Sequence, residues 1–373
     1  MALKFGVAFP FFYPDVKRPY GELLNECIEV AVRADELGYE CIMLPEHHFT
    51  NYIANPSDLI FAARIAAVTK RIRILTGVLV LPYYHPLALA EDIALVDWMT
   101  EGRLDVGVAR GAAKYEFDRL GIDWNQNRAM YEEALDILVK TWTTEDLEYR
   151  GRFWSFDSTT TLPRPYQKPH PPLWISGQSL EGVRAIAAKG ANLLTSPNYG
   201  CFAPHGDVDI TLGEFHKALA EYGQPKPNIG LLRRVYIAET EEEAERYVDY
   251  CFRHWTYYMS FFDADQRRRF HERVYVDAPV RGGAMTPAQV SLDLSNVYER
   301  YDDPIITTPE KAIRRLKHYE SLGVTHVLML TAFGVPHRDV LRSMELVARE
   351  VMPHFRDDAA TERLVAAAGA TRG

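Results

Sequence analysis

Three residues with proton-transfer and ligand chemistry follow one short apolar run of the chain. Glu46, His47 and His48 come directly after the run 40–44. Imidazole has an ordinary pKa of about 6.5, so a histidine at this place can give or take a proton near neutral pH. Neighbouring side chains in extended chain point to opposite faces, which makes these three residues a poor ligand set for one metal ion. The pattern therefore favours acid–base chemistry over a metal centre.

A second set of residues has the chemistry of a phosphate site. The stretch 176–179 reads Ser-Gly-Gln-Ser and leads into a helix that the sequence pattern predicts up to residue 189. Backbone N–H groups at a helix N-terminus bind phosphate readily. Arg110 and Arg128 can add charge-assisted, bidentate contacts. Together these residues predict a phosphate-bearing ligand without saying which one.

The elements that position these groups alternate between short apolar runs and helical stretches. Eight runs are predicted to be strands, each followed by a helix, and they span 3–9, 40–44, 72–81, 104–109, 172–176, 191–196, 229–238 and 325–331. Continuously apolar strands are typical of parallel sheets that are buried on both faces. Eight such units predict an α/β protein with a (β/α)8 TIM barrel and elaborated loops. No GxGxxG motif follows the first strand, which disfavours a dinucleotide-binding doubly wound sheet.

In a (β/α)8 barrel the active site lies at the carboxyl ends of the strands. Both sets of residues above fall at predicted strand ends, and so do Tyr83, His85 and Phe333. This clustering of polar and aromatic residues at one face is the strongest prediction that the residues make by themselves.

Two segments are longer than a barrel needs. The segment 114–126 is predicted to be a long loop, and the segment 258–301 is longer still, polar and interrupted by Gly and Pro. A loop of that length in a compact domain is usually functional or mobile. We expect one barrel domain over 1–355 and a flexible tail over 356–373.

The overall composition excludes several classes of protein. The net charge is −9 and the Lys and Arg residues are scattered, which argues against nucleic acid as a partner. None of the four cysteines has CxxC or zinc-ligand spacing, which favours a reducing, cytoplasmic setting. The first strand begins without a signal-peptide pattern, and no apolar run approaches the roughly 18 residues of a membrane-spanning helix.

Several motifs in order and register resemble the bacterial luciferase-like flavin monooxygenases. The stretch 45–50 (PEHHFT) resembles that family's E-H-H-F signature, and 81–86 (LPYYHP) resembles its L-P-x-x-H-P turn. The block 102–111 (GRLDVGVARG) resembles the family's G-R-x-x-x-G-x-x-R-G pattern, and Arg128 follows at the spacing of a second phosphate arginine. Each motif alone is weak, but together they cover most of the chain and are densest over 1–139.

The resemblance implies a cofactor and roles for particular residues. Reduced FMN would bind across the strand ends, and His47 would be the catalytic histidine. The FMN phosphate would meet Arg110, Arg128, Ser176, Gly177, Gln178 and Ser179, and the flavin ring would lie near Gly77, Val78 and Ala109. A non-proline cis peptide would join Gly77 to Val78. The substrate pocket would be formed by Phe9, Phe11, His48, Tyr83, His85, Trp174 and Phe333, and the segment 258–301 would cover it.

The implied chemistry is oxygenation by reduced flavin and O2 through a C4a-hydroperoxide, which needs a dry, shielded site. Some luciferase large subunits carry Cys where this chain has Ala109, so hydroxylation or Baeyer–Villiger oxygen insertion into a small organic substrate is expected rather than light emission. Relatives take reduced flavin from a separate NAD(P)H-flavin reductase, so such a partner is expected. A homodimer is expected by analogy alone.

Three alternatives stay open from the sequence. One is a deazaflavin-dependent dehydrogenase on the same barrel, and another is a non-catalytic flavin-binding subunit, which the presence of His47 disfavours. The third is a hydrolase that acts on a phosphorylated sugar or uses a metal, and no convincing set of metal ligands supports it.

Overall fold

A computed structural model describes residues 2–9, 11–197, 203–204, 206–259 and 297–356 of the chain. The expected covering loop over 258–301 and the expected tail over 356–373 lie almost entirely outside these residues.

Eight parallel strands close into a barrel within the described residues. Each strand pairs with its neighbours in the order β1–β2–β3–β5–β8–β9–β11–β14, and β14 pairs with β1 to complete the ring. The strands are β1 (Lys4–Ala8), β2 (Cys41–Leu44), β3 (Arg73–Thr76), β5 (Leu104–Ala109), β8 (Leu173–Ser176), β9 (Asn192–Thr195), β11 (Ile229–Ile237) and β14 (His326–Leu330). The predicted TIM barrel is therefore confirmed, with all eight strands at the predicted places.

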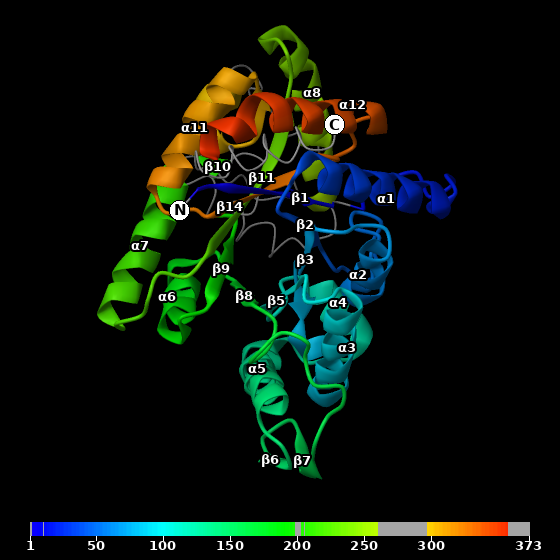
Figure 1. Ribbon diagram of the computed structural model, residues 1–373, viewed down its shortest axis with the longest axis vertical. Helices are drawn as coiled ribbons and strands as arrows, with labels where there is room; N and C mark the ends of the chain where they lie inside the picture. The colour runs from blue at the N-terminus through cyan, green and yellow to red at the C-terminus, as the bar shows by residue number, and fades with distance from the viewer. Residues whose placement is uncertain (1, 10, 198–202, 205, 260–296, 357–373) are drawn as a thin grey trace, which may run out of the picture.

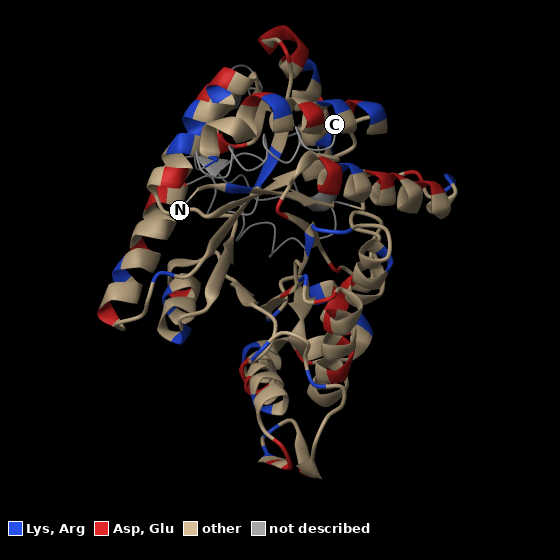
Figure 2. Cartoon of the chain, in the orientation of Figure 1, with Lys and Arg blue, Asp and Glu red and all other residues tan. Residues whose placement is uncertain are grey.

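Helices surround the strands, as Figure 1 shows. They are α1 (Tyr20–Leu37), α2 (Asp58–Ala66), α3 (Pro86–Met99), α5 (Asn127–Thr143), α6 (Leu180–Lys189), α7 (Asp207–Glu221), α8 (Glu241–Met259), α11 (Pro309–Ser321) and α12 (His337–Leu346). Acidic and basic side chains are interspersed along these outer helices (Figure 2). Each described helix is too short or too polar to span a bilayer.

The barrel interior is filled by side chains. Seven buried residues make a small cluster inside it, namely Ala8, Cys41, Met43, Leu75, Trp174, Leu194 and Leu328. Val78 packs against this cluster while staying partly exposed. The interior is thus a packed core, as in other barrels of eight strands, and ligands have to bind above it at the strand ends.

The third strand of the barrel is interrupted where the flavin ring was expected. β3 ends at Thr76 and a short strand β4 (Leu79–Val80) follows, with a cis peptide between Gly77 and Val78, as the resemblance implied. β3 and β4 both pair with β5. Between their paired positions, the chain that joins β3 to β4 has one residue more than the matching stretch of β5. The side-chain hydroxyl of Thr76 replaces backbone pairing at this irregularity. It donates to the carbonyl of Gly107 at 2.9 Å and accepts from the Gly107 N–H at 2.8 Å.

The prediction of a long loop over 114–126 is wrong. The segment contains α4 (Lys114–Leu120) and a 3-10 turn over Trp124–Gln126. Lys114 pairs with Asp118 one helical turn away, and Gly121 ends the helix in the left-handed conformation. The side chain of Phe117 is fully buried, so tertiary packing stabilises a helix too short to show a periodic pattern.

Several small elements were not predicted. They are the hairpin β6 (Leu147–Arg150) and β7 (Ser155–Thr159), the strands β10 (Ala203–Pro204), β12 (Tyr301–Asp303) and β13 (Ile305–Thr307), and the short helix α10 (Val297–Arg300). β13 pairs in parallel with the end of β11 beyond the barrel, so it extends the sheet without joining the ring.

Candidate active site

A buried carboxylate holds the imidazole of His47. Nδ1 of His47 lies 2.7 Å from Oε1 of Glu116, the third residue of α4. The same oxygen accepts the backbone N–H of His48 at 3.0 Å and the hydroxyl of Tyr115 at 3.1 Å. The other oxygen accepts the hydroxyl of Tyr83 at 2.7 Å. The Glu116 side chain is 2% exposed and that of His47 is 19% exposed, so the imidazole is the accessible member of the pair.

These contacts determine the charge of Glu116. Burial alone would raise the pKa of its carboxyl group, but the hydrogen bonds from His47, Tyr83 and the backbone of His48 outweigh burial and lower the pKa. Glu116 is therefore ionised at neutral pH.

A second carboxylate–histidine pair lies beside the first. Nε2 of His48 is 2.9 Å from Oε1 of Glu46, whose side chain is fully buried. Burial raises the pKa of Glu46, and the hydrogen bond to Glu46 raises the pKa of His48. The histidine side chain keeps 20% of its surface exposed. Two adjacent histidines are thus each anchored from behind by a different buried acid.

A third buried acid supports the strand break. Asp58 begins α2 and accepts the N–H of Gly77 at 3.1 Å and the side-chain amide of Asn55 at 2.8 Å. Burial, with the negative charge of Glu46 as a smaller contribution, raises the pKa of Asp58 well above its ordinary value. This acid ties the N-terminus of α2 to the backbone on which the flavin ring was expected.

The predicted phosphate residues converge at the N-terminus of α6. Ser179 caps this helix by accepting the N–H of Gly182 at 3.1 Å. Arg128, near the start of α5, forms an ion pair of 2.8 Å with Glu181 in the first turn of α6. The hydrogen bond from Arg128 lowers the pKa of Glu181, and the charge of Arg110 lowers it further. Both arginines therefore lie close to the same helix terminus.

The backbone before α6 approaches that helix closely. A Cβ atom at Gly177 would lie 2.5 Å from Cδ1 of Ile186, so a side chain at this position would displace the end of the Ile186 side chain. Ser176, Gly177 and Gln178 are partly exposed between the end of β8 and the helix cap. The arrangement leaves backbone N–H groups at a helix N-terminus beside two cations.

The predicted pocket residues are not all brought together. Tyr83 and His48 lie in contact, with 5.6 Å between their ring centroids, whereas His85 is exposed at the cap of α3. Phe9 and Phe11 pack edge to face with each other inside the core.

Two further residues that were predicted for the pocket have buried rings. Phe333 is fully buried in the core. Trp174 lies inside the barrel with its ring against His326, the first residue of β14, and therefore at the amino end of that strand rather than at the active-site face.

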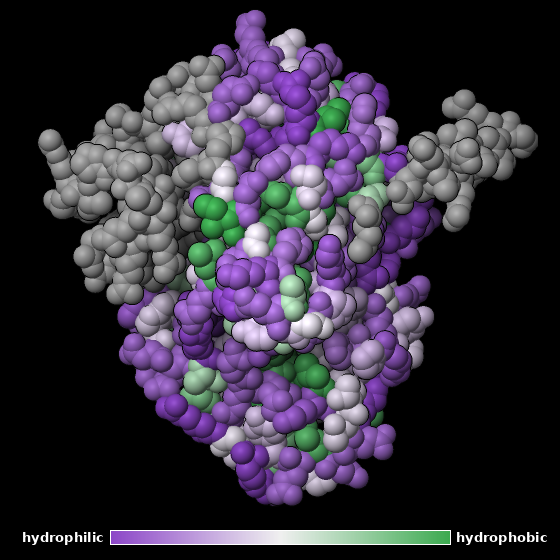
Figure 3. Space-filling view, turned by 90° about the vertical axis from the view of Figure 1, so that its left-hand side faces the viewer, coloured by the Kyte–Doolittle hydropathy of each residue, from purple (hydrophilic) through white to green (hydrophobic). Residues whose placement is uncertain are grey.

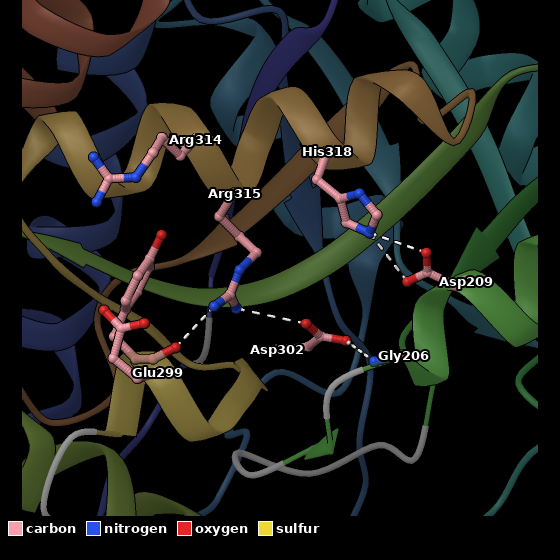
Figure 4. A pocket seen from close by; sticks show the side chains of 8 residues that line it. Gly206, Asp209, Glu299, Asp302, Arg314, Arg315 and His318 are labelled. Atoms are coloured by element: carbon pink, nitrogen blue, oxygen red, sulfur yellow. Dashed lines mark hydrogen bonds and ion pairs between the residues drawn. The ribbon is translucent and has the colours of Figure 1, made fainter.

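A surface pocket of about 370 Å³ lies elsewhere, between α7 and α11 (Figure 4). Its charged side chains form ion pairs, some of them with each other. Arg315 is 3.6 Å from Asp302, which accepts the N–H of Gly206, and His318 is 3.0 Å from Asp209. The pocket contains none of the predicted catalytic, cofactor or substrate residues, although Tyr298 and Glu299 belong to the segment 258–301 that was expected to cover the site.

The match to known proteins agrees with this geometry. A family model described as luciferase-like monooxygenase matches residues 3–326. The chain belongs to the luciferase-like monooxygenase family. Its enzymes are oxidoreductases, and the protein is therefore one as well.

Three relatives show how far the likeness extends. The oxygenase component of flavin-dependent trigonelline monooxygenase from Acinetobacter baylyi is 28% identical over 92% of each chain. The oxygenating constituent of 3,6-diketocamphane monooxygenase from Pseudomonas putida, solved with FMN, is 21% identical with a TM-score of 0.76, covering 95% of this chain and 99% of that one. The coenzyme F420-dependent tetrahydromethanopterin reductase of Methanopyrus kandleri is 18% identical with a TM-score of 0.72. The match covers 95% of this chain and 100% of that one.

Two of the three carboxylates behind the site were missed by sequence reasoning. Glu116 stands in the segment that was predicted to be a loop, and Asp58 was not singled out. One signal was present, because Asp58 and Glu116 are acids next to apolar residues that become buried. Acids are almost never buried without a partner, so an acid among core residues indicates a polar role.

Proposed function

We propose that this member of the luciferase-like monooxygenase family is the oxygenase component of a two-component enzyme. It would use FMNH2 and O2 to oxygenate a small organic substrate, by hydroxylation or Baeyer–Villiger oxygen insertion. The observation that carries the proposal is the order of groups along the strand ends. Neighbouring strands place His47 after β2, Gly77 and Val78 after β3, Ala109 and Arg110 at the end of β5, and residues 176–179 after β8.

This order suits an elongated ligand with a phosphate at one end. From β2 to β8 there are three strand spacings, or roughly 15 Å. Gly77, Val78 and Ala109 are partly exposed between the two ends, which leaves room for a flat ring over the packed interior. Arg110, Arg128 and the N-terminus of α6 supply the positive end. The residues present therefore fit FMN.

Each group then has a role that its chemistry allows. A bound reduced flavin would supply the electrons and the reaction with O2. Arg110 and Arg128 would bind the phosphate, and Gly77, Val78 and Ala109 would support the ring. The imidazole of His47 would hold or move a proton at the opposite end, next to the reacting atoms.

The choice of FMN over the deazaflavin coenzyme F420 rests on likeness to relatives. The trigonelline enzyme is named as flavin-dependent, and the diketocamphane enzyme is in complex with FMN. An F420-dependent enzyme also shares the fold, so a dehydrogenase with F420 is the second candidate. The name "oxygenase component" of the trigonelline enzyme supports a separate reductase as the source of FMNH2.

We propose a homodimer because of an apolar surface on α2 and α3. Six large apolar side chains there are between 46% and 76% exposed, namely Ile60, Leu95, Trp98, Met99, Leu162 and Tyr166. We call these six residues the α2–α3 patch. Trp98 and Tyr166 touch edge to face, which joins α3 to the segment after β7. Monomeric proteins rarely expose large apolar clusters of this kind.

The charges beside the α2–α3 patch suit a second copy of the chain. Arg64 on α2 and Glu91 and Asp92 on α3 are exposed at its edge. A two-fold interface needs both signs of charge on one surface, since each copy meets the same surface of the other. By contrast, the face over α6, α7 and α11 is mostly hydrophilic (Figure 3).

Two described cysteines fit the proposed cytoplasmic location. Cys27 and Cys41 are buried free thiols, and free thiols persist in reducing compartments.

The proposed reaction is tested by isotope incorporation. The protein, a flavin reductase, NADH, FMN and a panel of small cyclic ketones and aromatic compounds are incubated under 18O2, and the products are analysed by mass spectrometry. The proposal expects a product with one 18O atom that requires both the reductase and this protein. It also expects no such product from His47→Ala, which should still bind FMNH2. Substrate oxidation with F420 and without oxygen incorporation would overturn the proposal in favour of the dehydrogenase.

A further inference from the structure

We propose that Glu116 is a positioning residue that places the proton of His47 on Nδ1 and leaves Nε2 as the basic nitrogen of the site. The role of His47 in turnover rests on the proposed function above. The state of its ring does not, since it follows from contacts within this chain.

The contacts of Glu116 define its state. His48 N, the Tyr115 hydroxyl and the Tyr83 hydroxyl are all donors, and they occupy both carboxylate oxygens. A carboxylate that receives three such hydrogen bonds in a buried position is held in its ionised, acceptor-only form. The fourth neighbour, Nδ1 of His47 at 2.7 Å, must then carry a hydrogen, because a lone pair at that distance would face a negative oxygen.

The tautomer of His47 follows from this contact. A neutral imidazole carries one N–H, so a proton on Nδ1 leaves the lone pair on Nε2. The ring of Tyr52 lies edge-on at 5.6 Å between centroids and restricts how the imidazole can tilt. Nε2 is on the side of the ring away from Glu116, and it is the nitrogen able to take a proton.

The neighbouring pair has the opposite arrangement. His48 faces Glu46 through Nε2 rather than through Nδ1. The two histidines therefore offer different nitrogens for catalysis, although they are adjacent in sequence and have similar exposure. This difference supplies an internal comparison for the experiment.

The same geometry recurs where a carboxylate orients a catalytic histidine. In serine proteases, replacing the carboxylate by an amide keeps the fold but leaves the histidine in the wrong tautomer, at a cost of about 10⁴ in turnover. Here Glu116 is supplied by α4 and His47 by the segment after β2, so packing of α4 on the barrel sets the orientation of the ring.

The test is the tautomer of His47, read by long-range 1H–15N NMR of the protein labelled with 15N in its histidine rings. The His47 signals are assigned by their loss in His47→Gln, and the spectra are recorded at rising pH until the ring shifts stop changing, so that the neutral ring is observed. The proposal expects His47 with its proton on Nδ1. In Glu116→Ala no carboxylate oxygen accepts from Nδ1, so His47 should change to the Nε2–H form.

Two variants serve as controls. Tyr83→Phe removes one donor to Glu116 but keeps the carboxylate, so His47 should keep its Nδ1–H form. Glu46→Gln should change the ring signals of His48 and leave the tautomer of His47 as it is. If Glu116→Ala fails to fold, the wild-type spectrum still decides, since a proton on Nε2 of His47 would overturn the proposal. An unchanged His47 tautomer in folded Glu116→Ala would overturn it as well.

A turnover measurement separates this inference from the proposed function. Glu116→Ala should lower oxygenation by about 10²–10⁴-fold while FMNH2 binding changes little, and Glu116→Asp should restore part of the rate. An Nδ1–H tautomer in a protein that shows no oxygenation would leave the positioning by Glu116 standing and overturn the proposed function alone.

Discussion

His47 and His48 are neighbours in the chain, yet they are held by different acids that come from different elements. Glu116 reaches His47 from α4, and Glu46 reaches His48 from two residues earlier in the same segment. Each acid is buried while each imidazole is partly exposed. A buried acid next to each imidazole fixes the orientation of the ring. A catalytic histidine needs such a fixed orientation, and a histidine on the open surface does not have it.

At the phosphate end, Glu181 is a carboxylate where an anion is expected to bind. It pairs with Arg128, so the phosphate of the proposed FMN would have to displace that contact. We predict that Glu181→Gln binds FMNH2 several-fold more tightly, and that Arg128→Ala binds it more weakly. Anaerobic fluorescence titration measures both affinities.

The matched control is Glu132→Gln. Glu132 pairs with Lys189 and also joins α5 to α6, but at the other end of α6. Removing this ion pair should leave FMNH2 affinity unchanged. If Glu181→Gln bound no better than Glu132→Gln, the phosphate would not sit at the N-terminus of α6.

The sequence revealed the exposed members of the site better than the buried ones. His47, His48, Tyr83 and Arg110 follow apolar runs and could be placed at strand ends by the barrel rule, whereas Arg128 was singled out within a predicted helix as a second phosphate arginine. Glu116 could not, because its helix is seven residues long and exists through the packing of Phe117. Trp174 and Phe333 were expected at the pocket, and only the structure shows that their rings pack inwards.

Among the elements, the junction of β3 and β5 is the most constrained. A Cβ atom at Gly107 would lie 2.1 Å from the carbonyl oxygen of Thr76, which is backbone and cannot move aside. We predict that Gly107→Ala destabilises the protein by at least about 2 kcal/mol, since it forces apart the strands beside the interruption. Urea unfolding followed by circular dichroism measures the change.

Gly213→Ala is the control for this substitution. Gly213 lies within α7, and an added Cβ would meet nothing within 4 Å. Alanine has the higher helix propensity, so this variant should be more stable by up to about 1 kcal/mol. Equal effects of the two substitutions would show that the strand junction tolerates a side chain.

The strands were predictable because each is a continuous apolar run that ends in a turn or a helix start. The hairpin of β6 and β7 was not, because its strands are only four and five residues long and none of their residues is fully buried. β13 is three residues long and lies next to a proline. It is too short for a strand to be recognised from an alternating pattern.

At the scale of the whole molecule, the α2–α3 patch predicts the oligomeric state. We expect the wild-type protein to sediment as two chains. Ile60→Lys combined with Leu95→Lys should give a single chain, because two charges on each copy would be buried at the interface. Analytical ultracentrifugation distinguishes the two states.

Ile210→Lys is the matched control, because Ile210 is 62% exposed on α7 and lies outside the α2–α3 patch. It should leave the dimer intact. A wild-type protein that sediments as one chain would contradict the dimer proposal, and so would dissociation caused by Ile210→Lys alone.

The central claim is that this barrel binds reduced FMN by its phosphate, and anaerobic titration with FMNH2 tests it most directly. The protein and the double variant Arg110→Ala/Arg128→Ala are titrated in parallel with FMNH2, with reduced riboflavin and with reduced F420. The account predicts saturable FMNH2 binding, at least tenfold weaker binding of riboflavin, and loss of that difference in the double variant. Tight binding of F420 with none of FMNH2, or equal binding of FMNH2 by both proteins, would contradict it.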